Sequence, residues 1–207
     1  TNIPAQDRDF DGVSVGELLA NAHRSHLPLM AIRDQTSWSC HHGVLRWSGE
    51  CPDAADGRWK RPLRAALDRL AAAVDAVTER EAGEIGVDLW AARDAWVDVA
   101  AEFATAEEVV ARILAAGLGL PPARAARMAA DPASSKRIVT LMRAQRSRLA
   151  MFASDAWFWD DPARAEAAQA LRFAAHAARL VDELAGTHLE ATLVADLGAL
   201  RSPGTGL

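Results

Sequence analysis

The residue types best suited to chemistry are concentrated between residues 36 and 51. This stretch contains both cysteines of the chain, Cys40 and Cys51, together with two adjacent histidines and two tryptophans. Thiolate sulfur and imidazole nitrogen are good ligands for zinc and other transition metals, and indole rings offer flat apolar faces. The segment therefore predicts binding, either of a metal ion or of a ligand with an apolar face.

The candidate metal ligands are Cys40, His42 and Cys51. Asp155 is the expected fourth ligand if its segment lies beside the cysteines, and His41 is a substitute. Zinc accepts mixed sulfur, nitrogen and oxygen ligands in a tetrahedron, although this spacing is not that of a standard zinc finger or ribbon. A disulfide or redox pair, or two free thiols packed in a loop, are the alternatives. A bound zinc or other transition metal would clamp a loop that lacks secondary structure.

A second cluster combines aromatic rings with carboxylates between residues 151 and 161. An indole can stack on the apolar face of a sugar ring while a carboxylate such as Asp160 accepts hydrogen bonds from the sugar hydroxyls. Arg46, in the first cluster, is a forked donor that suits sugar hydroxyls or a carboxylate. Plugging one end of a helical core is the alternative role for these rings. The predicted glycan-binding residues are Trp38, His42, Arg46, Trp47, Trp157, Trp159 and Asp160.

No catalytic residues are predicted. Nucleophilic catalysis by Cys40 with a neighbouring histidine is disfavoured, because the nucleophile and base of thiol enzymes come from separate elements. Asp160 and Asp161 are adjacent, whereas glycoside hydrolysis needs two carboxyl groups facing each other across the scissile bond, about 5 to 10 Å apart. The scattered glycines form no phosphate-binding loop.

Composition restricts the class of protein. The chain has 207 residues, is 50% hydrophobic and carries a net charge of -5, with acidic and basic residues interleaved. A chain of this size can bury a full core, and the lack of a basic stripe predicts neither a nucleic acid nor a membrane surface as a partner. Two cysteines are too few for a disulfide scaffold. The amino terminus has no features of a secretion signal, so a cytoplasmic location is expected.

The spacing of apolar residues divides the chain into three parts. Glycine and proline interrupt residues 1–57, which predicts an irregular, loop-rich segment packed on the remainder, with a short helix over 15–23 and an extended segment over 27–32. Residues 58–200 show helical periodicity and abundant alanine, which favours close helix packing. The predicted fold is an all-α helical bundle, followed by a frayed tail over residues 201–207.

Three helix starts have local signals. Thr105 with Glu108 three residues later predicts a capping box. Asp131 and Asp161 are each followed by proline, which predicts an N-cap and a first helical position. These signals divide the bundle into successive helices.

The motifs also occur in the order seen in a known family. They comprise Trp38, Cys40, His42, Gly43, Arg46, Trp47 and Cys51; Trp59, Arg64, Leu67 and Asp68; Asp88, Trp90, Arg93 and Asp94; Ser154, Trp157, Phe158 and Asp160; and Gln169, Leu171, Arg172 and Ala174. Over about residues 30 to 185 the pattern resembles the carboxyl-terminal helical region, a domain of unknown function, of bacterial glycoside hydrolase family 57-like proteins.

The resemblance implies a helical domain that closes over the cleft of a preceding incomplete (β/α) barrel and adds aromatic residues to an α-glucan-type site. In such proteins the barrel carries the catalytic glutamate and aspartate, for which this sequence shows no counterpart. The expected function is glycan binding, with a catalytic barrel in cis or in trans for any hydrolysis. The family tends to have cysteines where this chain has Asp155 and, after Cys51, Pro52 and Asp53.

Two other interpretations stay open. One is a free-standing helical protein whose metal-clamped Cys/His loop serves binding or assembly. The other is a helical interaction domain without a small ligand. An upstream reading frame that encodes a barrel would favour glycan binding, and a start codon beside Thr1 would favour a free-standing protein.

Overall fold

The computed structural model describes residues 15–24, 30–31, 33–37, 40–198, 200–204 and 206. The chain forms two compact units, residues 1–36 and 37–207. All regular secondary structure in the described residues is helical, which confirms the all-α prediction. None of the described helices is long and apolar enough to cross a membrane.

The first unit contains helix α2 (Val15–Arg24), where the sequence predicts a short helix. The predicted extended segment over 27–32 falls mostly outside the described residues. The helices of the second unit are α3 (Leu45–Ser48), α4 (Lys60–Ile85), α5 (Leu89–Ala95), α6 (Val97–Ala100), α7 (Ala106–Leu118), α8 (Pro122–Ala130), α9 (Pro132–Ala150), α10 (Asp155–Phe158), α11 (Ala165–Ala185) and α12 (Leu189–Leu197).

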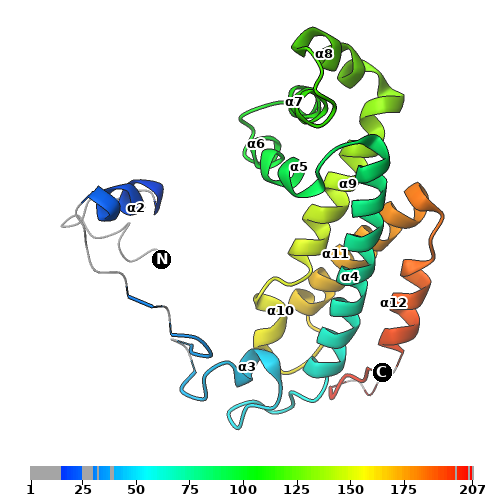
Figure 1. Cartoon of the computed structure of the whole chain (residues 1–207). Coiled ribbons are helices and arrows are strands. Elements are labelled where there is room, and N and C mark those ends of the chain that lie inside the picture. Colours follow the sequence, from blue (N-terminus) through cyan, green and yellow to red (C-terminus); the bar gives the residue numbers. More distant parts are fainter. Residues whose placement is uncertain are drawn as a thin grey trace. The chain divides into compact units, whose positions relative to one another are not determined.

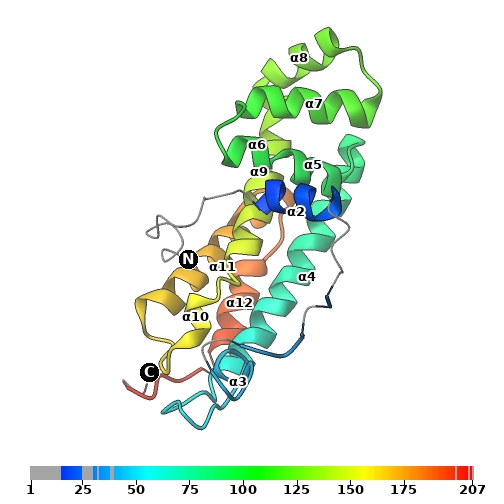
Figure 2. The same cartoon turned by 90° about the vertical axis from the view of Figure 1, so that its left-hand side faces the viewer.

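Helices α4, α9, α11 and α12 form the body of the second unit as a bundle in which successive members alternate in direction (Figures 1 and 2). Helices α5 to α8 gather at one end of this bundle, and α3 and α10 lie together at the other end. The connection between α4 and α9 therefore builds one end of the unit, and the chain before α4 builds the other.

Alanine brings α11 close to its neighbours in the bundle. The buried side chains along this helix are Ala167, Ala170, Ala174, Ala177, Ala178 and Val181, each at most 1% exposed. All of them except Ala167 belong to one core with α4 residues such as Leu63 and Leu67. Small side chains at a helix contact shorten the distance between the helix axes. This confirms that alanine here serves close packing.

A second core lies among α5, α7, α8 and the first half of α9. Val109, Val110 and Leu114 of α7 are at most 1% exposed and face Ile138 and Leu141 of α9. Helix α9 contributes to both cores, since its later residue Ala144 belongs to the first. The two cores therefore share one rigid element.

Buried polar side chains connect α4 to α9. Gln145 is fully buried and donates to Asp75 Oδ1 at 3.0 Å and Thr78 Oγ1 at 2.8 Å. Nearby, hydrogen bonds from Arg137 lower the pKa of the Glu81 carboxyl. Because a buried polar group without a partner costs about 1–3 kcal/mol, these contacts fix the register of the two helices.

Two of the three predicted helix starts are confirmed. Thr105 and Glu108 form the capping box of α7, and Asp131 caps α9 by accepting from Ser134 N at 3.0 Å. The prediction at Asp161 is wrong, since α11 begins only at Ala165. The Asp161 carboxylate instead accepts from Ala163 N at 2.8 Å and from the Ser202 hydroxyl at 2.8 Å. A side-chain turn therefore competes with the cap, and it holds the buried Ser202 of the carboxyl-terminal segment.

We expect Ala174→Leu to lower the free energy of unfolding by about 1–3 kcal/mol, because extra methyl groups overpack the contact of α11 with its neighbours. Urea unfolding followed by circular dichroism measures the change. Ala165→Leu, at the exposed start of the same helix, is the control and should leave the midpoint nearly unchanged. Equal midpoints for both variants would contradict close packing along α11.

Candidate metal centre and adjoining pocket

Two hydrogen-bonded turns supply the four candidate metal ligands. Gly43 N donates to Cys40 O at 3.1 Å, and Ala54 N donates to Cys51 O at 2.9 Å. Each turn presents its first and third residues, so Cys40 is paired with His42 and Cys51 with Asp53. Gly43 has φ of 68°, a left-handed conformation that glycine adopts without strain. Short-range backbone geometry therefore brings the ligands of each pair together.

The four ligand atoms lie within 4.8 Å of one another. The two sulfur atoms are 3.7 Å apart, and His42 Nδ1 lies 3.8 Å from Cys40 Sγ and 3.6 Å from Cys51 Sγ. Asp53 Oδ2 is 3.4 Å from His42 Nδ1. Both cysteines are free thiols, Cys51 buried and Cys40 partly buried.

Four of the six separations, those among the two sulfurs and His42 Nδ1 and that between His42 Nδ1 and Asp53, match the edges of a tetrahedron around one zinc ion. With Zn–S bonds of about 2.3 Å and Zn–N or Zn–O bonds of about 2.05 Å, tetrahedral geometry places S and S about 3.8 Å apart, S and N about 3.6 Å, and N and O about 3.4 Å. Each distance given between these ligand atoms agrees with its edge to within about 0.2 Å. The four atoms as a group lie within 4.8 Å of one another, so the sulfur and imidazole ligands have tetrahedral spacing and the Asp53 carboxylate lies close to them.

The structure brings together three of the four predicted metal ligands. Cys40, His42 and Cys51 belong to the group, and its carboxylate comes from Asp53. Asp155 lies outside the group, exposed at the start of α10. His41 is exposed, with Nδ1 3.9 Å from Asp53 Oδ2. Asp53 was not predicted as a ligand. It lies two residues after Cys51, just as His42 lies two residues after Cys40.

Arg46 attaches the ligand-bearing loop to the bundle. Its Nε donates to Phe158 O at 2.9 Å, its Nη1 donates to Asp53 O at 3.0 Å, and its guanidinium lies 4.8 Å from the centre of the Phe158 ring. Asp160 completes the attachment, since Oδ2 accepts from Ala55 N at 3.2 Å and Oδ1 lies 3.7 Å from Arg46 Nη2. Two predicted glycan-binding residues, Arg46 and Asp160, therefore have structural partners.

Lys60 is a fully buried cation beneath this loop. Its Nζ donates to the carbonyl oxygen of Arg46 and lies 5.7 Å from the centre of the Trp59 ring. Burial lowers the pKa of the Lys60 ammonium, as does the charge of Arg46, whereas Asp160 and Cys51 raise it. A buried ammonium is costly unless negative charge lies nearby, and the Asp160 carboxylate supplies such charge.

The loop closes on itself where Gly57 meets Gly49. A Cβ atom added at Gly57 would stand 2.1 Å from Gly49 O, which is an impossible backbone contact. Cys51 and Asp53 lie between these two glycines. The close approach of the backbone therefore sets the size of the loop that carries half of the ligands.

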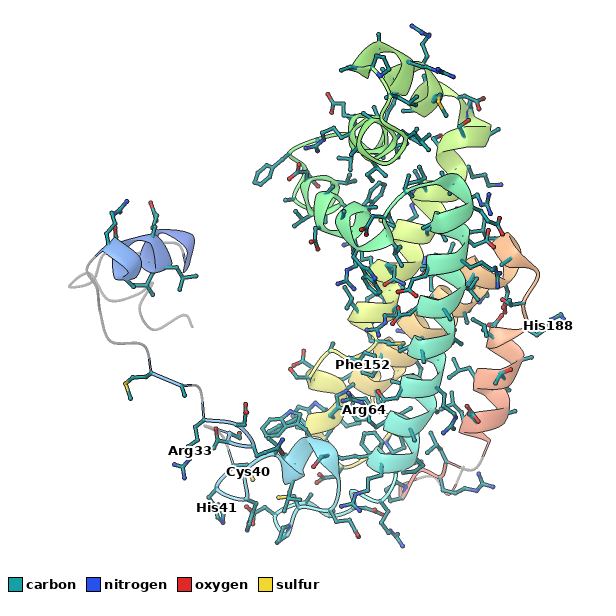
Figure 3. The ribbon with its side chains drawn as sticks, viewed as in Figure 1. Arg33, Cys40, His41, Arg64, Phe152 and His188 are labelled. Atoms are coloured by element: carbon teal, nitrogen blue, oxygen red, sulfur yellow. The ribbon has the colours of Figure 1, made fainter. Side chains whose placement is uncertain are left out.

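A pocket of about 540 Å³ adjoins the loop, between α3, α4 and the segment that leads into α10. Figure 3 shows Arg64 of α4 beside Phe152, and Cys40 and His41 in the loop next to α3. Its lining combines aromatic rings with ionic and hydroxyl groups: Val44, Trp47, Ser48, Arg61, Arg64, Ala65, Asp68, Phe152, Ser154 and Trp157. The sequence missed Arg61, Arg64, Asp68 and Phe152 as pocket residues because only tertiary packing brings them together.

The predicted glycan-binding tryptophans separate in the structure. Trp47 and Trp157 line the pocket, but Trp157 is 5% exposed and stacks on Trp59 at 6.3 Å between ring centres. Trp159 does not line it, and its ring is covered by Arg164 at 4.2 Å. Trp38 lies outside the described residues. Trp47 is therefore the tryptophan best placed to present a ring face to a ligand.

A comparison with protein families identifies the helical part of the chain. Residues 56–203 match the family described as a domain of unknown function (DUF3536), and the chain belongs to that family. No curated protein and no solved structure matches the chain. The match covers the bundle and the α4, α9 and α10 sides of the pocket. The four candidate metal ligands precede it.

Gly57→Ala should open the loop, because its Cβ would collide with Gly49 O. In the metal-free protein we expect Cys51 to react with a thiol reagent roughly tenfold faster or more, since local opening exposes a buried sulfur. Reaction of each cysteine is followed by mass spectrometry after proteolysis. Gly83→Ala, where a Cβ meets nothing within 4 Å, is the matched control. An unchanged Cys51 rate in Gly57→Ala would show that the close approach does not hold the loop.

Proposed function

We propose that Cys40, His42, Cys51 and Asp53 bind one zinc ion that clamps the loop before α4 onto the helical bundle. The agreement between the ligand-atom separations and the edges of a zinc tetrahedron carries this proposal. Four protein ligands leave no open coordination position, and such closed sites are structural. The family match supports the bundle as the scaffold to which the loop is attached.

The charges around the site favour a metal bound by two thiolates. A zinc ion with two thiolates, one neutral imidazole and one carboxylate has a net charge of -1. Lys60, buried and electrostatically coupled to Cys51, compensates for that charge. Thiolates stay available to a metal in a reducing compartment, and we propose the cytoplasm as the location.

The purified chain should contain about one equivalent of tightly bound zinc, and Cys51→Ser should weaken binding by roughly two orders of magnitude because it removes a buried thiolate ligand. Elemental analysis gives the stoichiometry, and competition with a chromophoric chelator gives the affinity. Cobalt substitution tests the geometry, since tetrahedral thiolate-bound cobalt has intense visible absorption bands that octahedral cobalt lacks.

Substitutions of two aspartates distinguish this ligand set from the one that the sequence predicts. Asp53→Asn should weaken zinc binding, whereas Asp155→Asn is the matched control and should bind like the parent protein. A metal-free protein that takes up neither zinc nor cobalt would refute the metal site. Loss of zinc binding in Asp155→Asn but not in Asp53→Asn would instead identify Asp155 as the fourth ligand, as the sequence predicts.

We also propose that the pocket beside the loop binds a glycan. The observation that favours this second function is the lining, in which the Trp47 ring lies among guanidinium, carboxylate and hydroxyl groups. Sugar sites combine an apolar ring face with directional polar groups in this way. The resemblance to glycoside hydrolase family 57-like proteins supports an α-glucan-type ligand and a catalytic barrel, in cis or in trans, as the source of the hydrolytic carboxylates. With a net charge of -5, we propose neither nucleic acid nor a membrane as a partner.

Trp47→Leu keeps an apolar side chain at this position but removes the flat ring. We expect it to weaken the binding of oligosaccharides by roughly twofold to tenfold, since aromatic contacts contribute about 0.5–1.5 kcal/mol beyond buried area. Calorimetric titration with a panel of neutral and acidic oligosaccharides, maltotriose included, measures the loss.

Trp90→Leu is the control for this substitution. Trp90 is 40% exposed on α5, where Arg93 lies 4.6 Å from the centre of its ring. Equal weakening in both variants, or binding of no oligosaccharide by the parent protein, would remove the glycan proposal. Thermal unfolding of each variant confirms that the bundle is intact.

A further inference from the structure

The pocket beside the metal loop has an excess of positive charge in a chain that is acidic overall. Its ionisable lining residues are Arg61, Arg64 and Asp68, which give a net charge of +1. Arg64 Nε donates to Asp68 Oδ1 at 2.9 Å, so these two charges are paired. Arg61 forms no ion pair or hydrogen bond with the residues that the structure describes, and its guanidinium lies along Gly49. One guanidinium is therefore available to a ligand.

The paired arginine also keeps donors for a ligand. Only Nε of Arg64 is engaged in the described part of the chain, and the guanidinium lies 4.7 Å from the centre of the Phe152 ring. Ser48 and Ser154 are exposed and line the pocket, and their hydroxyl groups form no hydrogen bonds with the described residues. These groups can hydrogen-bond to a polyhydroxylated ring while Arg61 binds its negative charge.

The charge balance points to a singly charged anion. A carboxylate matches one guanidinium fork by two parallel hydrogen bonds. A doubly charged phosphate would leave one negative charge uncompensated and close to Asp68. The volume of about 540 Å³ lies in the usual range for small-molecule sites, about 300–1,000 Å³, and admits a short oligosaccharide.

The wall that faces α4 is built by the segment between the two ligand pairs. Val44, Trp47 and Ser48 lie after His42 and before Cys51. A metal bound by residues on both sides of this segment fixes α3, and with it the Trp47 ring. A metal at this position would therefore add to the contacts that hold the α3 wall of the pocket in place.

We propose that this pocket binds a sugar ring that carries one carboxylate, of the hexuronate class, with Arg61 as the residue that selects the charge. The inference rests on the proposed glycan site and goes beyond the neutral α-glucan that the resemblance implies. The metal loop is a positioning element for the site, because it holds the Trp47 wall in place.

The zinc-loaded 207-residue chain is titrated by calorimetry with a monouronate trimer, maltotriose in which one terminal glucose is replaced by glucuronate, and separately with maltotriose itself. We expect the monouronate trimer to bind about tenfold more tightly, because charge-assisted hydrogen bonds are roughly twice as strong as neutral ones. Arg61→Gln should abolish this preference while leaving zinc content and thermal stability unchanged. Arg69→Gln is the matched control on α4, since Arg69 pairs with Asp196 and does not line the pocket. Removal of zinc with a chelator should weaken binding of the monouronate trimer.

The outcomes separate the three proposals. Equal affinities for the two trimers, or an unchanged preference in Arg61→Gln, would overturn the hexuronate assignment while glycan binding stands. Binding of neither trimer by zinc-loaded protein would overturn both the assignment and the glycan site, and the metal site would stand. Benzoate that competes as strongly as galacturonate monomer would show that any carboxylate-bearing ring suffices and would overturn the sugar assignment. Binding of the monouronate trimer that survives complete removal of zinc would overturn the positioning role of the metal.

Discussion

The contacts of the Arg46 guanidinium hold together the end of the bundle that carries the candidate metal site and the pocket. The guanidinium reaches a backbone carbonyl in α10, a backbone carbonyl in the metal loop and the face of Phe158. Lys60 donates to the carbonyl oxygen of Arg46 from the buried side. The segment is thus held in part by cations that satisfy backbone carbonyls, and removal of either cation would leave a part-buried carbonyl oxygen without that partner. The metal ligands and the pocket wall are positioned by the same few contacts.

The helical bundle provides the rigid surface that these contacts need. Alanine along α11 permits close helix packing, and Gln145 fixes the register of α9 against α4. The start of α4 and the end of α9 consequently occupy defined positions, from which Arg64 and Phe152 meet across the pocket. Functional groups on loops need such a scaffold, because loops alone do not hold side chains to sub-ångström tolerances.

The sequence predicts what depends on local spacing. Apolar periodicity and caps identify the helices, and the Thr105 cap is found as expected because both of its partners lie within one helical turn. Cys40 and His42 converge for the same reason, since a single turn places them together. Asp161 shows the limit of a local rule: the same carboxylate can cap a helix or close a side-chain turn, and its contact with Ser202 comes from a distant part of the chain. Arg46 and Asp160 were assigned to a ligand because their protein partners, far away in sequence, were not visible.

Loop entropy favours Asp53 over Asp155 as the fourth ligand of the proposed metal site. Asp155 would have to be brought to the cysteines by the fold of the whole bundle, whereas Asp53 is two residues from Cys51 and shares its turn. A ligand held by a local turn loses little additional conformational freedom when the metal binds, so local ligands are favoured wherever they exist. The main remaining loss of conformational entropy on metal binding comes from joining the turn at Cys40 to the turn at Cys51. The chain between these two turns contains α3. The metal would thus restrain the short segment that carries Trp47, in addition to the contacts of α3 with α10 and α4.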